Sequence, residues 1–348
     1  MATQQDGGGV PLAIAHDQRH FRLLELPPDI VGLLDAPDPP LFPSLSLKSR
    51  APAQAAGTPN ATAAYAVLCT PDKTFQLRQV QTSNSLLVTH PILQHHGNDE
   101  MPIPATCAIA SCTATLQLHV STASAVGLLS DALSVYDIVA GDVDATPNGR
   151  GKPNVFADMP VSDGECEAAW TELMAFEVDG SSYQPSASAL SQVWRAIHAA
   201  ALAEGIPLNK EFMTDDITRA AAEEGHPPAF IHAVLAHLST DDRVKTSPWS
   251  CLDRAKTVAF TGRTLLASKR GADFLIADFT DTWEDRLPEL WRKDAKLSAI
   301  EAFYEFPSDT TIRAKNTAAS PRAGDSTVAA MKPSARKWHD KFAKTRNK

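Results

Sequence analysis

The sequence predicts an α+β fold with strands in its N-terminal part and helices in its C-terminal part. Up to about residue 120, apolar and polar residues alternate at a period of two, which is typical of half-buried strands. Beyond about residue 166, apolar residues recur at the helical period of 3.6. Residues 141–165, between the two patterns, are rich in Asp, Gly, Pro and Asn, and this composition predicts a linker.

The first elements are expected near the N-terminus. Phe21 to Leu26 is predicted to be a strand, and Pro27 to Leu34 a short helix with proline at its start. Proline is favourable there because the first helical position has no use for the backbone N–H that proline lacks. Residues 35–64 are dense in Pro, Ala, Ser and Thr, which predicts a long surface excursion. Tyr65 to Thr70 is a short apolar run and forms the first strand of a hairpin. These elements belong to a predicted domain over residues 1–140.

The string from Cys69 to Val88 carries the second strand of this hairpin. Phe75 and Leu77 share one face of it, in alternation with polar residues. Thr82 to Ser85 are four small polar residues that can hydrogen-bond their own backbone, so we expect the strand to end there. An apolar run, Leu86 to Val88, then begins a new strand. Further strands are expected over residues 106–110 and 115–120.

These strands are too few to close a barrel by themselves. The exposed edges of a sheet are blunted or are completed by another chain. The sequence therefore predicts an N-terminal β-barrel-like domain that is completed by partner subunits. The apolar residues expected to contact the partner strands are Phe75, Leu77, Leu86, Leu87 and Val88.

The C-terminal part predicts tandem winged-helix (helix-turn-helix) domains. Residues 166–248 hold three periodic helices and a short strand and wing around Arg243 and Lys245, which is typical of one winged-helix-like unit. Residues 249–315 predict a second unit, with no room for a complete third. A basic tail, residues 316–348, follows. A further helix is expected over residues 125–139, ahead of the linker.

Three stretches of the chain resemble the sister chromatid cohesion protein family Dcc-one. They are the stretch from His20 through Leu34, the Cys69 to Val88 string, and Leu287 to Arg292 with the helix after it. The resemblance implies a subunit of the alternative, cohesion-specific replication factor C clamp loader. It also implies that the N-terminal part is built jointly with the small subunit and with the C-terminal tail of the large subunit.

The resemblance further implies the task of the assembly. The winged-helix end would dock on the catalytic subunit of DNA polymerase epsilon, so that the sliding clamp PCNA is loaded or unloaded near the leading-strand polymerase and cohesion is established. PCNA would be an indirect partner. ATP hydrolysis would belong to other subunits, because this chain has no Walker motif. The predicted role is a non-catalytic adaptor.

An alternative is a winged-helix DNA-binding regulator, which would use Arg243 and Lys245 directly. The third helix of the first unit disfavours it, because Ala229 to Leu238 contains no Lys or Arg to contact phosphates. The C-terminal tail interleaves cations with aromatic residues. Three interpretations fit it equally: binding to DNA or an acidic partner, a solvated tail, and a nuclear localisation signal. Its candidate cations are Arg336, Lys337 and Lys341.

No cofactor, metal or catalytic site is predicted. The pair His95 and His96 with Cys107 and Cys112 has the wrong spacing for a zinc site. The paired carboxylates Asp215-Asp216 and Asp241-Asp242 lie where a helix start or a turn favours acids. An enzyme using Cys69 or the Cys107–Cys112 pair would need a base that the sequence does not offer.

The overall composition fits an intracellular protein. The chain has 348 residues, a formal net charge of −9 and five cysteines without regular spacing, so we expect reduced thiols. It has neither an apolar run long enough to span a membrane nor a secretory signal. We therefore expect no membrane association, and the resemblance implies the nucleus.

Overall fold

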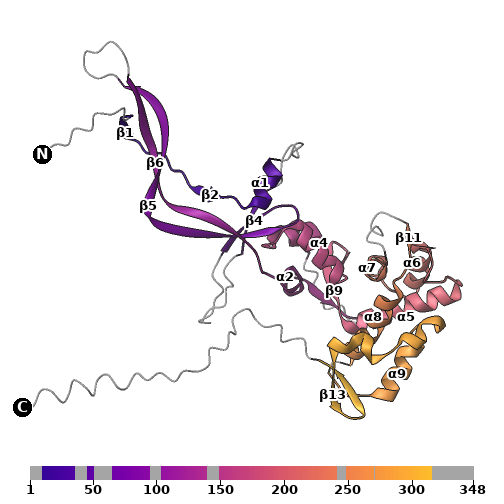
Figure 1. The fold of residues 1–348 in the computed structure, drawn as a ribbon. Helices are drawn as coiled ribbons and strands as arrows, with labels where there is room; N and C mark the ends of the chain where they lie inside the picture. Colours follow the sequence, from indigo (N-terminus) through magenta and orange to yellow (C-terminus); the bar gives the residue numbers. More distant parts are fainter. Residues whose placement is uncertain are drawn as a thin grey trace, which may run out of the picture. The chain divides into compact units, whose positions relative to one another are not determined.

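The computed structural model describes residues 10–35, 45–50, 65–94, 103–138, 149–240, 248–269 and 271–315 (Figure 1). The chain divides into two compact units, residues 1–257 and 258–348. Strands dominate the chain up to Val120 and helices dominate it beyond Ala125, so the predicted α+β class is confirmed.

A six-stranded sheet forms the N-terminal part of the first unit. Its order is β1-β6-β5-β4-β3, and β2 also pairs with β6. The strands are β1 (Leu12–Ile14), β2 (Leu23–Glu25), β3 (Ser46–Arg50), β4 (Tyr65–Cys69), β5 (Thr74–Gln94) and β6 (Ile103–Val120). Within the described residues this sheet is open, so the predicted barrel is not closed by this chain.

The strands β5 and β6 are much longer than the sequence predicts, and they lie side by side along most of their length (Figure 1). The predicted strand end at Thr82 to Ser85 is wrong. Gln81 is opposite Ala114, and the next pair is Leu86 with Cys112, so these four residues form an irregularity within one continuous strand. Small polar side chains are tolerated there because Ser83 to Ser85 are exposed to solvent.

The strand β3 corrects the predicted surface excursion of residues 35–64. It pairs antiparallel with β4 along its whole length, from Ser46 opposite Cys69 to Arg50 opposite Tyr65. The many prolines of residues 35–64 argued against a strand, but β3 is a short segment without proline in which Leu47 alternates with polar residues. Residues 36–44 and 51–64 of the predicted excursion lie outside the described residues.

The helix α1 (Pro28–Leu34) confirms the predicted helix. It covers the end of the sheet that contains Leu68, Phe75 and Leu118, which we call the base of the sheet. Its Ile30 is fully buried and packs with Leu68, Phe75 and Leu118, while Leu77 lies against this cluster. Burying such side chains stabilises a fold by about 1.5–3 kcal/mol each. The base of the sheet therefore has its own small core.

Within the described residues, the helical part contains three repeats, each with the order helix, strand, two or three helices, and one or two closing strands. The first repeat is α2 (Ala125–Ala132), β7 (Ser134–Tyr136), α3 (Lys152–Asp158), α4 (Asp163–Glu172), β8 (Phe176–Val178) and β9 (Ser181–Pro185). The second is α5 (Ala187–Ala203), β10 (Phe212–Met213), α6 (Thr214–Ala222), α7 (Pro228–Leu238) and β11 (Trp249–Ser250). The third is α8 (Arg254–Ser268), β12 (Phe274–Leu275), α9 (Ile276–Asp285), the 3-10 helices η2 (Glu289–Asp294) and η3 (Leu297–Phe303), β13 (Tyr304–Ser308) and β14 (Thr311–Ala314).

The first repeat was not predicted. The linker expected over residues 141–165 contains α3 and the start of α4, and the helix expected over 125–139 ends at Ala132. Two sequence signals mark this repeat: the pair Ser162 and Glu165 forms a capping box at α4, and Asp179-Gly180 forms the turn between β8 and β9. Both turn residues have positive φ angles, 49° and 73°, as such a two-residue hairpin requires.

The second unit packs around aromatic side chains. Phe279 and Trp283 are fully buried, and the indole Nε1–H of Trp283 donates to the carbonyl oxygen of Val258 at 3.0 Å. A Cβ on Gly262 would lie 2.6 Å from the Trp283 ring, so glycine is what allows this approach. The strands of this unit have the order β12-β14-β13.

Lys48 joins the sheet to the helices of the first unit. Its side chain is only 12% exposed, and its Nζ donates to the carbonyl oxygens of Phe156 at 3.2 Å and Val161 at 2.9 Å. It also pairs with the Asp163 carboxylate at 2.8 Å. All three ammonium protons thus have acceptors, as a nearly buried charge requires. We call this contact region, with the one described next, the joint.

The second half of the joint connects the start of β5 to the capping box of α4. The backbone N–H of Ser162 donates to Thr74 Oγ1 at 2.7 Å, and the Thr74 hydroxyl donates to the Glu165 carboxylate. Gly164 N donates to the carbonyl oxygen of Pro71 at 2.7 Å. A Cβ on Gly164 would lie 2.8 Å from that oxygen and 3.0 Å from Asp72 Cα, so the contact needs glycine.

We expect Gly164→Ala to weaken the joint, because the added methyl group meets backbone atoms that no rotamer change can move. Overpacking of this kind costs about 1–3 kcal/mol. The control is Gly32→Ala in α1, where an added Cβ meets nothing within 4 Å and helix propensity improves. Urea unfolding should show destabilisation for the first variant only; equal stability of the two would contradict the described packing.

Burial raises the pKa of Cys166, beside the joint, to about 11. At pH 8 only about one molecule in a thousand would then carry this thiolate, which is the nucleophile. In the native protein, iodoacetamide should modify Cys166 far more slowly than half-buried Cys251, and its rate should rise about tenfold per pH unit below the pKa. Mass spectrometry of the modified peptides measures this, and equal rates at pH 8 would contradict the burial.

Candidate partner-binding surface

The outer edge of β5 is unpaired over most of its length within the described residues. The strand β4 pairs with β5 only from Thr74 to Gln76, whereas β6 pairs with the other edge of β5 as far as Gln94. From Leu77 to Gln94, no described strand lies along the outer edge. We call this segment the open edge. An edge that no described strand covers can accept a strand from another chain.

The strands β5 and β6 form a long two-stranded ribbon. The outer edge of β6, opposite the open edge, pairs with the N-terminal segment of the same chain. The strands β1 and β2 both run parallel to β6, with Leu12 opposite Thr106 and Leu23 opposite Thr115. Between them, Arg19 N donates to the carbonyl oxygen of Ile109 at 2.8 Å. Among the described strands, the long edge without a neighbouring strand therefore belongs to β5.

Leu86 and Leu87 lie on the open edge with 57% and 47% of their surface exposed. Adjacent residues of a strand point to opposite faces, so both faces of the ribbon are uncovered at this position. Leu93 is 67% exposed further along the strand, and Val88 is half-buried. An isolated ribbon of this kind gains little from burial, which leaves its apolar surface available to a partner.

The five apolar residues predicted to contact partner strands fall into two groups. Leu86, Leu87 and Val88 lie on the open edge. Phe75 is completely buried in the core under α1, and Leu77, although it is the first residue of the open edge, packs its side chain against that core. Alternation in the sequence placed Phe75 and Leu77 correctly on a strand, but it could not show that a helix of the same chain covers them.

The N-terminal strands add exposed apolar residues that the sequence reading missed. Leu12 and Ile14 on β1 are 57% and 70% exposed, and Leu24 on β2 is 41% exposed. Leu47 on β3 is 72% exposed. The signal was present as the short alternation around Ala13, but three residues are too few for a period to be recognised. Exposed apolar residues are thus also present on other strands of the sheet.

The helix α7 contains no Lys or Arg, and its apolar side is buried through Ile231, Val234, Leu235 and Leu238. His237 Nδ1 lies 3.3 Å from the carbonyl oxygen of Thr171, a contact within the protein. The candidate cations Arg243, Lys245, Arg336, Lys337 and Lys341 lie outside the described residues.

The described part of the chain contains no group of three or more His, Cys, Asp or Glu side chains placed to bind a metal ion. His95 and His96 lie outside it. Among the helices that the structure describes, none combines the length and apolar character that crossing a membrane requires.

Comparison with known proteins agrees with the resemblance seen in the three sequence stretches. A search of curated proteins returned no significant match. The family model for sister chromatid cohesion protein Dcc1 matches residues 21–319, which include the open edge, the joint and all three helical repeats. Because this match covers most of the chain, the protein belongs to the sister chromatid cohesion protein Dcc1 family, and its role lies in sister chromatid cohesion.

Proposed function

We propose that the protein is a non-catalytic adaptor subunit of the alternative, cohesion-specific clamp loader. The observation that carries this proposal is the open edge, where no described strand pairs with a long stretch of β5 and leucines are exposed on both faces. A sheet with such an edge is suited to completion by strands of partner chains. We propose that these chains are the small subunit and the C-terminal tail of the large subunit, and that together they close a barrel.

The helical repeats support the second half of the proposal. The third repeat has the element order and the sheet order β12-β14-β13 of a winged helix, with β13 and β14 as the wing. We propose that all three repeats are winged-helix units and that this end docks on DNA polymerase epsilon, so that PCNA is loaded or unloaded near the polymerase in the nucleus. The absence of cations on α7 favours protein contact over groove reading for the second unit.

The adaptor function needs no reaction at this chain. ATP hydrolysis by other subunits would drive opening of the clamp, while this chain would connect the loader to the polymerase. Linking two sites in one assembly raises the effective concentration of one for the other without a new chemical step. The joint would serve this role by holding the base of the sheet against α4.

The test is co-purification of the full chain with the small subunit and the large-subunit tail. Leu86→Asp combined with Leu87→Asp should weaken assembly at least about tenfold, because two charges replace apolar surface at the proposed contact. Both residues are exposed, so the thermal stability of the free chain should change little.

Leu202→Asp is the matched control, because Leu202 is 77% exposed on α5, away from the sheet. It should leave assembly unchanged. Unaltered affinity of the double variant for the two partner chains would overturn the proposed interface.

A further inference from the structure

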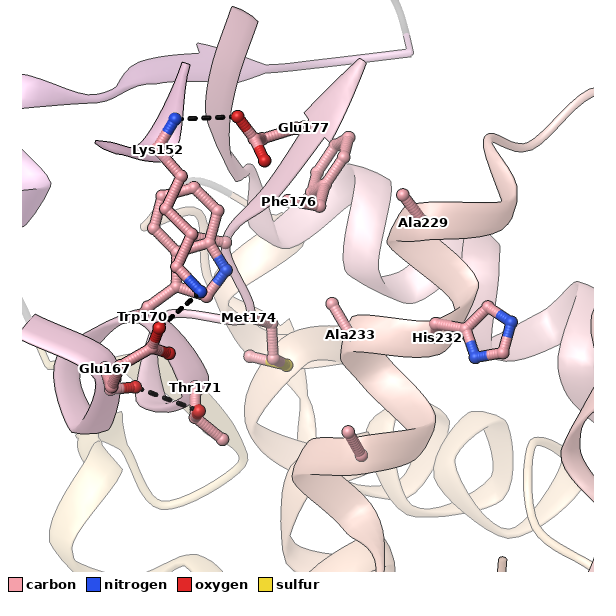
Figure 2. Close-up of a pocket in the computed structure, with 12 residues that line it drawn as sticks. Lys152, Glu167, Trp170, Thr171, Met174, Phe176, Glu177, Ala229, His232 and Ala233 are labelled. Atoms are coloured by element: carbon pink, nitrogen blue, oxygen red, sulfur yellow. Dashed lines mark hydrogen bonds and ion pairs between the residues drawn. The ribbon is translucent and has the colours of Figure 1, made fainter. Parts of the chain in front are cut away.

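A cavity of about 600 Å³ lies between α4, β8 and α7 of the first unit, and Figure 2 shows the side chains around it. Its size is within the range of sites that bind small molecules or peptide side chains. Apolar side chains from three elements face it: Met174 and Phe176 near β8, Trp170 on α4, and Ala233 and Ala236 on α7. None of these residues belongs to the open edge.

The cavity exists because α7 is lined with alanines where it faces α4 and β8. Ala229, Ala233 and Ala236 are spaced by four and three residues, which places them on one side of the helix. Larger side chains at these positions would fill the space. On the other side of α7, Phe230, Ile231, Val234 and Leu235 are fully buried, so the helix itself is firmly anchored.

Met174 contributes to the cavity from a strained position. Its φ is 51°, a left-handed conformation that costs a residue other than glycine about 1 kcal/mol. The end of α4 imposes this conformation, because Ala175 N donates to the carbonyl oxygen of Trp170 at 3.0 Å and Met174 N donates to that of Thr171 at 3.2 Å. A glycine would relieve the strain but would remove the flexible thioether, which adapts to varied apolar shapes.

The rim of the cavity is acidic once the internal contacts are taken into account. Lys152 Nζ is held by the Glu167 carboxylate at 2.7 Å and lies 5.0 Å from the centre of the Trp170 ring. The Glu177 carboxylate accepts the backbone N–H of Lys152 at 2.6 Å. Asp215 does not line the cavity; it lies 3.7 Å from His232, whose ring points away from Trp170 (Figure 2). Two carboxylates, Glu167 and Glu177, thus line the cavity beside one lysine that is already paired.

This charge pattern selects among possible ligands. A phosphate backbone would meet two carboxylates and a lysine that is already paired on this rim, so nucleic acid is disfavoured. A cationic side chain is favoured by the excess of carboxylates. The indole Nε1–H of Trp170 takes part in no hydrogen bond with any described residue, so it can donate to a backbone carbonyl of a ligand.

We propose that this cavity binds a short segment of a partner protein that places one large apolar side chain between Trp170, Met174 and Ala233. A Lys or Arg next to that side chain pairs with the rim carboxylates, and a backbone carbonyl accepts the Trp170 N–H. This site is separate from the open edge and does not depend on the adaptor function.

The experiment is selection of a phage-displayed random dodecapeptide library against the full chain. Selected peptides should share a Leu, Ile, Met or Phe within two residues of Lys or Arg. Ala233→Leu fills the cavity and should abolish this enrichment. Ala199→Leu, on the exposed side of α5, is the matched control and should retain it.

Solution binding of one selected peptide then tests the chemistry by fluorescence anisotropy. Ala233→Leu should raise the Kd at least about tenfold, and Glu177→Gln should raise it less. Exchanging the peptide's cations for Glu should abolish binding, and a single-stranded oligonucleotide should not compete. No enrichment, acidic enrichment, enrichment that survives Ala233→Leu, or competition by the oligonucleotide would each overturn the proposal.

Discussion

The joint around Lys48 and the α4 capping box is the contact on which the arrangement of the first unit depends. Lys48 comes from β3, and Thr74 begins β5, so two strands of the sheet are tied to one helix start. Removing one partner from a nearly buried charge network leaves an uncompensated group, which costs more than the network gains. Gly164 completes the joint by letting the backbone of α4 approach Pro71. The base of β5 is therefore fixed.

Because its base is fixed, β5 extends from the joint as a defined strand whose open edge can contact a partner. From Leu77 onward, β5 depends on β6 alone for pairing within the described residues, and leucines on both of its faces meet solvent. Stable sheets of this length bury at least one face, so the ribbon has the properties of one half of an interface. Membership of the Dcc1 family places the role of the protein in sister chromatid cohesion. The cavity beside α7 is chemically different, because it offers a small apolar pocket with an acidic rim.

Local sequence patterns predicted the elements that local forces determine. The helix α1 and the hairpin of β4 with the start of β5 follow from proline placement and periodicity. The strand β3 could not be predicted this way. It pairs with β4, but a long segment of low apolar content separates the two strands in the sequence. The polar segment from Thr82 to Ser85 wrongly predicted the end of a strand. The flanking residues pair with β6, and this pairing overrides the local preference of the segment. The burial of Phe75 under α1 and the three contacts of Lys48 are long-range, so no single window of sequence contains them.

The central claim is that the open edge is free in the isolated chain and covered by a partner strand in the assembly. Residue-resolved amide hydrogen exchange tests it most directly, on the full chain alone and with the small subunit and large-subunit tail. Alone, outward-facing amides between Leu77 and Gln94 should exchange quickly, and in the complex they should be protected at least about tenfold. Amides of the joint, such as Gly164 N, should be protected in both states. Protection of the open edge in the isolated chain, or its unchanged exchange in the complex, would contradict the account.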